Sequence, residues 1–412
     1  MVAWGSFPDV GALMAREGGA QPTGRRNPVR PLPRMRIPAI ALPLAAATVF
    51  VAAVGAPLPA SAAPAVDVVL TLPAPTGRYP VGVDTVHLRD ENRADPWVPE
   101  RRRELMTSVW YPSVGGTGGP ARYVSLDESR LILRQLRATE LPPEILSATE
   151  VHARAVARPH SRPGGWPLVV LSPGFSFPRS SLTSLAEDLA SRGYVVVGVD
   201  HTYEAAAVTF PDGRITDCLV CRMFEAGDAA PADVAIGRAA DVSFVLDELT
   251  SRNTPWRAGR TMIDARRIAM AGHSLGGASA ATTMVADHRV DAGVNMDGTF
   301  FAPVTRLDRP FLMLGAEGHG EPGNDRTWDE TWSRLAGWRR WISVDGTTHS
   351  SFTDYGVLGD QVAMPLQPMA GLRSAEITRS HVAAFVDRHL RHRPAPLLHE
   401  PSTRYPEVRF WP

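Results

Sequence analysis

The chain contains no lysine, only two cysteines and no excess of either charge. All 43 of its positively charged side chains are arginine, and they balance 43 aspartates and glutamates. A chain without a global positive field lacks the electrostatic attraction on which nucleic-acid binding depends, so we expect no nucleic-acid partner. A hydrophobic fraction of 44% and a charged fraction of 21% match a packed globular protein and exclude a largely disordered chain.

The two cysteines, Cys218 and Cys221, follow the turn-forming segment Pro211-Asp212-Gly213. In an exported protein, such a close pair is expected to form a local disulfide, whereas a redox-active pair opens a helix after a strand. A tetrahedral zinc site needs two more ligands, which the neighbouring sequence does not supply. We therefore predict a disulfide and no metal site, with free thiols or a redox role as the alternatives.

Residues 1–62 contain the three parts of a secretory signal. Arginines between positions 25 and 36 precede an apolar run from Ile37 to Val54, and Ala60-Ser61-Ala62 supplies a small-x-small cleavage site. We predict cleavage after Ala62 and export, with residues 63–412 as a single domain. The alternative is an uncleaved membrane anchor, because the apolar run approaches the roughly 20 residues that span a bilayer.

Strand-like and helix-like segments alternate from Pro167 onward, which predicts a mostly parallel sheet with helices on both faces. Residues 81–88 and 103–111 precede this region and show the pattern of an antiparallel strand pair. Residues 127–157 are predicted to be a helical insertion, either a solvated cap or a lid over a pocket. The expected parallel strands are 167–172, 194–200, 267–272, 291–297, 309–315 and 339–345. The expected helices are 180–193, 232–251 and 375–390, the last followed by a proline-rich tail.

The sharpest local signal is a G-x-S-x-G pattern around Ser274, directly after an apolar strand and before a segment of small residues. Gly272 and Gly276 remove side chains where the strand and the helix approach each other, so the chain can turn sharply and present the serine. This context predicts that Ser274 is a nucleophile. The alternative is a glycine-rich turn with a capping serine.

A serine nucleophile needs a histidine base that is oriented by a carboxylate, in the chain order serine, acid, histidine. His349 lies just past the last predicted parallel strand and is our candidate base; His319 follows an earlier strand. The acid is open from position alone, because Asp297, Glu317 and Asp345 all lie near strand ends. Asp297 is favoured, since it ends the strand that should lie beside the nucleophile.

Hydrolysis of an ester also needs two backbone amides that stabilise the oxyanion. Leu275, directly after the nucleophile, should supply one. Phe175, in the turn after the strand Val169-Val-Leu-Ser-Pro-Gly174, should supply the other.

Several motifs together resemble the serine-dependent α/β-hydrolases, and within them the plasma-type platelet-activating-factor acetylhydrolase family and its bacterial relatives. The resemblance covers about residues 76–408. The matching pieces are Ser108-Val-Trp-Tyr-Pro112, Ser172-Pro-Gly-Phe175, the segment Leu185 to Tyr194, Gly272-His-Ser-Leu-Gly-Gly277, Asp297, and His349-x-x-Phe352-x-Asp354.

The resemblance implies an α/β-hydrolase fold with Asp297 as the acid of the triad. It also implies hydrolysis of short-chain or phospholipid-type acyl esters through an acyl-enzyme, without a metal or other cofactor, and with transient contact with a lipid surface. The insertion at 127–157 and the loop at 202–231 match no lipid-binding surface that we can identify. The alternatives are a broader lipase or polyester hydrolase, and a secreted binding protein that uses the hydrolase scaffold without catalysis.

Overall fold

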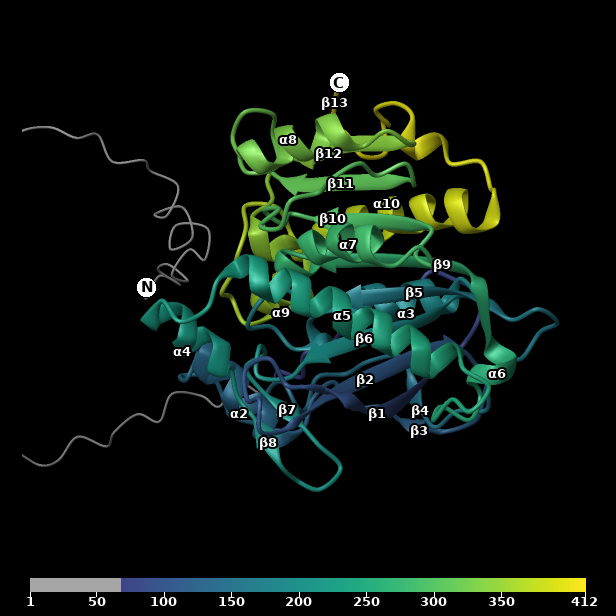
Figure 1. The fold of residues 1–412 in the computed structure, drawn as a ribbon, viewed down its shortest axis with the longest axis vertical. Helices are drawn as coiled ribbons and strands as arrows, with labels where there is room; N and C mark the ends of the chain where they lie inside the picture. The colour runs from purple at the N-terminus through teal and green to yellow at the C-terminus, as the bar shows by residue number, and fades with distance from the viewer. Residues whose placement is uncertain (1–67) are drawn as a thin grey trace, which may run out of the picture. The chain divides into compact units, whose positions relative to one another are not determined.

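An eleven-stranded mixed sheet forms the centre of the structure, a computed structural model that describes residues 68–412 (Figure 1). The signal sequence and cleavage site predicted within residues 1–62 lie outside the described residues. The strands follow one another across the sheet in the order β13-β12-β11-β10-β9-β5-β6-β2-β1-β4-β3. Their bounds are β1 Val81–Ala94, β2 Arg102–Pro112, β3 Gly119–Pro120, β4 Arg154–Ala155, β5 Trp166–Ser172, β6 Val195–His201, β9 Ile263–His273, β10 Ala292–Met296, β11 Phe311–Ala316, β12 Arg339–Val344 and β13 Val408–Trp411.

The pairing of these strands confirms the predicted α/β-hydrolase fold. The six central strands β6, β5, β9, β10, β11 and β12 run parallel to one another, whereas β1 and β2 form an antiparallel pair and β2 also pairs antiparallel with β6. Every residue of β5 is buried, as expected for a parallel strand that helices cover on both faces. A separate two-stranded hairpin is formed by β7 Val208–Thr209 and β8 Ile215–Thr216.

Helices cover both faces of the sheet and build two hydrophobic layers. Val169 of β5 packs in the layer that contains α3 and α10, and the neighbouring Val170 packs in the layer that contains α5 and α7. This alternation follows from the two-residue period of a strand. The helices and short helical turns are α2 Leu126–Gln135, η2 Arg179–Leu182, α3 Thr183–Ser191, α4 Leu219–Ala226, α5 Pro231–Thr250, α6 Gly259–Met262, α7 Leu275–Ala286, α8 Arg326–Arg334, η3 His349–Phe352, α9 Asp354–Gln361, α10 Gly371–Arg391 and η4 Pro396–Leu398.

Two segments differ from expectation. The tail after α10 is more than a proline-rich tail, because β13 pairs antiparallel with β12 and completes the sheet at that edge. The segment 127–157 has its own buried side chains: Ile132 and Leu133 of α2 pack in one cluster with Phe177 and Tyr355. One face of α2 therefore packs on the body of the domain, and the choice between a cap and a lid stays a prediction.

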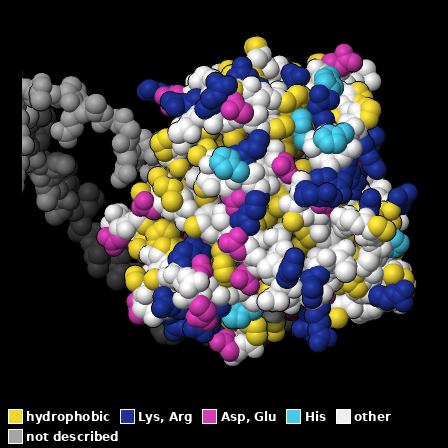
Figure 2. All heavy atoms as spheres, turned by 45° about the vertical axis from the view of Figure 1, so that its right-hand side comes forward, with side chains coloured by type: hydrophobic (Ala, Val, Ile, Leu, Met, Phe, Trp, Pro, Cys, Tyr) yellow, Lys and Arg dark blue, Asp and Glu magenta, His cyan; other side chains and the backbone are white. Residues whose placement is uncertain are grey.

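Figure 2 shows one face of the molecule, on which side chains of different kinds lie next to one another. Arginine, acidic and apolar side chains intermingle on the face shown in Figure 2. Within residues 68–412, no helix is both long enough and apolar enough to cross a bilayer.

Candidate active site

Ser274 lies in a strained turn between β9 and α7. Its backbone has φ 55° and ψ −129°, a conformation that non-glycine residues rarely adopt and that functional sites retain. A Cβ atom on Gly272 would lie 2.2 Å from the backbone of Gly276, and one on Gly276 would lie 2.1 Å from the carbonyl oxygen of Ser172. The two glycines therefore allow the close packing of strand, turn and helix that the sequence motif predicts.

Asp297 follows β10, the strand beside β9, and its carboxylate lies next to His349. The distance between Asp297 Oδ2 and His349 Nδ1 is 2.6 Å, and the carboxylate is fully buried. Burial opposes ionisation, but hydrogen bonds with His319 and His349 outweigh it and hold the pKa of the Asp297 carboxyl well below its usual range. An ionised acid is thus paired with the histidine that the sequence predicts as base.

The other two candidate acids lie elsewhere. Glu317 accepts a hydrogen bond of 2.7 Å from the amide of Gly346, and Asp345 pairs with Arg409 at 2.5 Å. Within the described residues, neither carboxylate contacts His349, so position in the fold favours Asp297.

His319 is a polar neighbour of the site whose role the sequence does not reveal. Its Nδ1 lies 2.8 Å from Asp297 Oδ1, and its Nε2 lies 3.1 Å from Asp325 Oδ2. Burial lowers the pKa of His319, but hydrogen bonds with the two carboxylates outweigh this effect and raise the pKa to about 10. His319 is therefore protonated at neutral pH. Each oxygen of the Asp297 carboxylate is hydrogen-bonded to one imidazole, Oδ1 to His319 and Oδ2 to His349. Only the placement of His319 after β11, beside β10, hints at this arrangement in the sequence.

The loop that carries His349 is fixed from two sides. His273 donates a hydrogen bond of 2.7 Å from Nε2 to the carbonyl oxygen of His349, and burial lowers the pKa of His273 to about 3, so its ring is neutral. Asp354, five residues beyond His349, accepts hydrogen bonds from the amides of Thr183 and Ser184 at the start of α3. The half-exposed His349 side chain therefore extends from a well-anchored turn.

The predicted oxyanion residues, Phe175 and Leu275, lie in turns beside Ser274. A Cβ atom on Gly174 would lie 3.3 Å from the Cβ atom of Ser274, so the turn that contains Phe175 passes directly next to the serine. Leu275 is the first residue of α7, where backbone amides have no acceptor within the helix. Phe175 and Leu275 thus lie in the two turns that flank Ser274.

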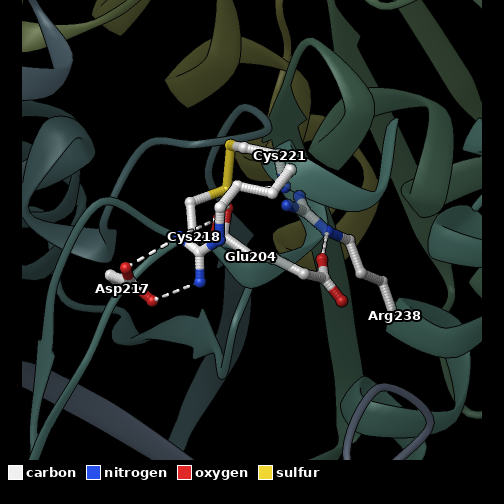
Figure 3. Close-up of a disulfide and its surroundings, with 6 residues drawn as sticks. Glu204, Asp217, Cys218, Cys221 and Arg238 are labelled. Carbon is white, nitrogen blue, oxygen red and sulfur yellow. Dashed lines mark hydrogen bonds and ion pairs between the residues drawn. A yellow bond between two sulfur atoms is a disulfide. The ribbon is translucent and has the colours of Figure 1, made fainter. Parts of the chain in front are cut away.

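Cys218 and Cys221 form a disulfide at the start of α4 (Figure 3). The two cysteines are three positions apart in the sequence, and their Cα atoms are 5.3 Å apart. Among the described residues there is no cluster of three or more side chains suited to hold a metal ion.

Comparison with known proteins places this site in a family. The family model described as platelet-activating factor acetylhydrolase, isoform II, matches residues 66–214 and 241–390. A protein from Arthroderma benhamiae named "Probable 1-alkyl-2-acetylglycerophosphocholine esterase" is 25% identical over 82% of this chain and 93% of its own length. The platelet-activating factor acetylhydrolase of Cavia porcellus is 24% identical over 55% of this chain and 58% of its own length.

A solved structure is more similar in sequence. A ferulic acid esterase from Streptomyces cinnamoneus is 44% identical, covers 83% of this chain and 99% of its own, and superposes with a TM-score of 0.74. These similarities confirm the resemblance seen in the sequence motifs. The chain belongs to the platelet-activating factor acetylhydrolase isoform II family of α/β-hydrolases and is a carboxylic-ester hydrolase.

Proposed function

We propose that the protein hydrolyses esters as a serine enzyme, with Ser274 as nucleophile, His349 as general base and Asp297 as the acid that orients the base. The observation that carries this proposal is the hydrogen bond of 2.6 Å between the buried Asp297 carboxylate and His349 Nδ1. This bond fixes the tautomer in which Nε2 is free to accept the serine proton.

The reaction proceeds in two halves. His349 Nε2 removes the proton from Ser274 Oγ, which attacks the ester carbonyl carbon, and the amides of Phe175 and Leu275 stabilise the oxyanion. The tetrahedral intermediate collapses, the C–O bond to the alcohol breaks, and His349 gives its proton to the departing oxygen. Water, deprotonated by His349, then attacks the acyl-enzyme and releases the acid and free Ser274.

The first substrate class that we propose is short-chain or phospholipid-type acyl esters. It is supported by the match of the family model over two long segments and by the name of the Arthroderma benhamiae relative. On such substrates the enzyme would make transient contact with a lipid surface.

The second substrate class is esters of aromatic acids. It is favoured by the 44% identity with a ferulic acid esterase and by aromatic side chains around the oxyanion residues, including Trp97, Tyr203 and Phe224. The third substrate class is esters of longer acyl chains or polyesters, which a broader lipase or polyester hydrolase would hydrolyse.

We also propose export of the mature enzyme after removal of residues 1–62. The support is the signal-like pattern in the sequence and the disulfide, a bond that persists in oxidising compartments. N-terminal sequencing of the protein released by an expressing cell tests this: a start at Ala63 is expected, and a cell-retained protein that keeps residues 37–56 would reject it.

The experiment that tests the function compares the mature protein with Ser274→Ala on p-nitrophenyl esters from acetyl to palmitoyl, and on methyl ferulate. We expect turnover by the unsubstituted enzyme and its loss in the variant. A preference for acetyl over palmitoyl supports the acetylhydrolase class, and a palmitoyl preference supports a lipase. Absence of turnover on every ester would reject catalysis in favour of a binding protein.

A further inference from the structure

A cluster of mostly apolar and aromatic side chains includes both residues whose amides are proposed to bind the oxyanion. We call it the oxyanion-side wall. Its buried members are Phe175, Cys218, Val220, Val234 and Leu275, and its partly buried members are Trp97, Tyr203, Cys221, Phe224, Ala229 and Phe301. None of these residues belongs to the triad or its hydrogen-bond partners, so the proposed mechanism assigns their side chains no role.

Helix α4 supplies the outer part of this wall. The Phe224 ring stacks on the Phe175 ring, with 4.6 Å between ring centroids and 27° between planes. Such a contact stabilises a ring pair by about 0.5–1.5 kcal/mol beyond the burial of its area. Since Phe175 also provides the proposed oxyanion amide, Phe224 touches the residue on which the carbonyl of the substrate depends.

The disulfide closes the first turn of α4, because Cys218 caps this helix and Cys221 is its third residue. The helix has eight residues, and only Val220 among them is buried, so a crosslink in its first turn helps to keep it helical. Cys218 caps its first turn: the amide of Cys221 donates to Cys218 Sγ at 3.2 Å, and the two sulfurs are bonded. The amide of Val220 donates to the carbonyl oxygen of Tyr203 at 3.0 Å.

Buried charges also support the oxyanion turn, and Figure 3 shows two of them, Glu204 and Arg238, near the disulfide. Arg238 Nη1 donates to the carbonyl oxygen of Pro173 at 2.6 Å, and Arg238 Nε donates to Glu204 at 2.7 Å. Trp97 Nε1 donates to the other oxygen of the same carboxylate at 3.1 Å, and the backbone carbonyl of Glu204 accepts from the amide of Ser176. These hydrogen bonds anchor the turn, and Trp97 of the wall takes part in them.

The sheet order indicates which part of an ester meets this wall. His349 follows β12, on one side of the nucleophile strand β9, whereas Tyr203 follows β6, on the other side. The alcohol must leave beside His349, because that imidazole protonates it. In the proposed pose, the acyl group extends away from His349, toward the side of β9 on which the wall residue Tyr203 lies.

We propose that the oxyanion-side wall, with Phe224 on the helix whose first turn the Cys218–Cys221 disulfide closes, selects esters of planar aromatic acids by stacking against the acyl ring. This inference rests on the proposed serine mechanism and chooses between its substrate classes. An acetyl group is too small to cover the exposed parts of these rings, whereas a cinnamoyl-type acyl group presents a flat apolar face that matches them.

The test compares two substrates with the same leaving group, p-nitrophenyl ferulate and p-nitrophenyl acetate. Phe224→Leu keeps an apolar side chain but removes the ring, and we expect kcat/KM for the ferulate to fall about 3- to 10-fold, chiefly through KM, as the loss of one ring contact predicts. The value for the acetate should stay within about twofold. Arg222→Gln, on the exposed side of the same helix, is the matched control. It should leave kcat/KM unchanged for both the ferulate and the acetate.

A second arm uses the disulfide. Cys218 and Cys221 are the only cysteines of the chain, so any effect of a reductant on this enzyme comes from their bond. A trialkylphosphine takes the oxygen of a water molecule to become the phosphine oxide, while the disulfide gains two electrons and the two protons of that water. This reduction should raise KM for the ferulate in the unsubstituted enzyme. The phosphine should have no effect on Cys218→Ser/Cys221→Ser. This arm needs no change at Phe224, so it holds even if Phe224→Leu fails to fold.

Equal losses on both esters in Phe224→Leu, or no loss on either, would overturn the proposal, as would an unchanged KM for the ferulate after reduction. If the unsubstituted enzyme hydrolyses neither ester, the proposed function itself fails, which is a separate result.

Discussion

The shared carboxylate of Asp297 makes His319 a pH-dependent source of stability. The substitution His319→Gln removes the imidazolium while keeping a polar side chain. The difference between the ordinary histidine pKa of 6.5 and the value of about 10 in the fold, at about 1.4 kcal/mol per pH unit, sets an upper limit of about 5 kcal/mol on its contribution. Because 34% of the side chain is exposed, screening reduces this figure, and we expect about 1–2 kcal/mol.

The sign follows from the direction of the shift. A pKa raised on folding means that the folded state binds the proton more tightly, so the stabilisation is complete below about pH 6.5 and disappears as the pH rises toward about 10. Urea unfolding of both proteins at pH 6, 8 and 10 measures it. We expect the difference in unfolding free energy to be largest at pH 6 and to shrink at pH 10. A difference that stays constant across this range, or is absent at pH 6, would refute the assignment of a charged His319.

Three further substitutions test other parts of the site. Asp297→Asn should lower kcat by about 10⁴-fold, because the neutral amide no longer fixes the base tautomer, and a rate near that of the unsubstituted enzyme would reject Asp297 as the acid. Gly174→Ala places a Cβ atom 2.7 Å from His273 Nδ1 and close to the nucleophile, so we expect kcat to fall at least about tenfold with the fold retained by circular dichroism. Glu204→Gln removes the charge that pairs with the buried Arg238, and chemical denaturation should show a loss of about 3–5 kcal/mol; a loss below about 1 kcal/mol would show that this pair does not support the turn.

Much of the fold could be predicted because its pattern is local. The alternation of apolar strands with helices locates all six parallel strands, and Gly272 and Gly276 mark the sharp turn around Ser274 by their lack of side chains. The strand β13 could not be predicted in the same way, because its four residues, Val408–Trp411, become a strand only through pairing with β12.

The hydrogen bond between His319 and Asp297 could not be predicted from the sequence for a similar reason. His319 is 22 residues from Asp297, and only the parallel pairing of β10 with β11 brings the ends of these strands together. The wall around Phe175 is also a tertiary feature, because it joins α4 to turns that follow other strands. The catalytic motifs are readable because they are short, whereas their surroundings arise from contacts between distant segments.

Covalent trapping of the nucleophile tests the central claim most directly. A p-nitrophenyl alkylphosphonate reacts with an activated serine by forming an O–P bond and releasing p-nitrophenol, and it leaves a stable adduct that mimics the tetrahedral intermediate. Peptide mass spectrometry should find one phosphonyl group on Ser274, together with loss of esterase activity, and no adduct in Ser274→Ala. A fully active enzyme without the adduct, an adduct on another residue, or equal ester hydrolysis by Ser274→Ala would contradict the account.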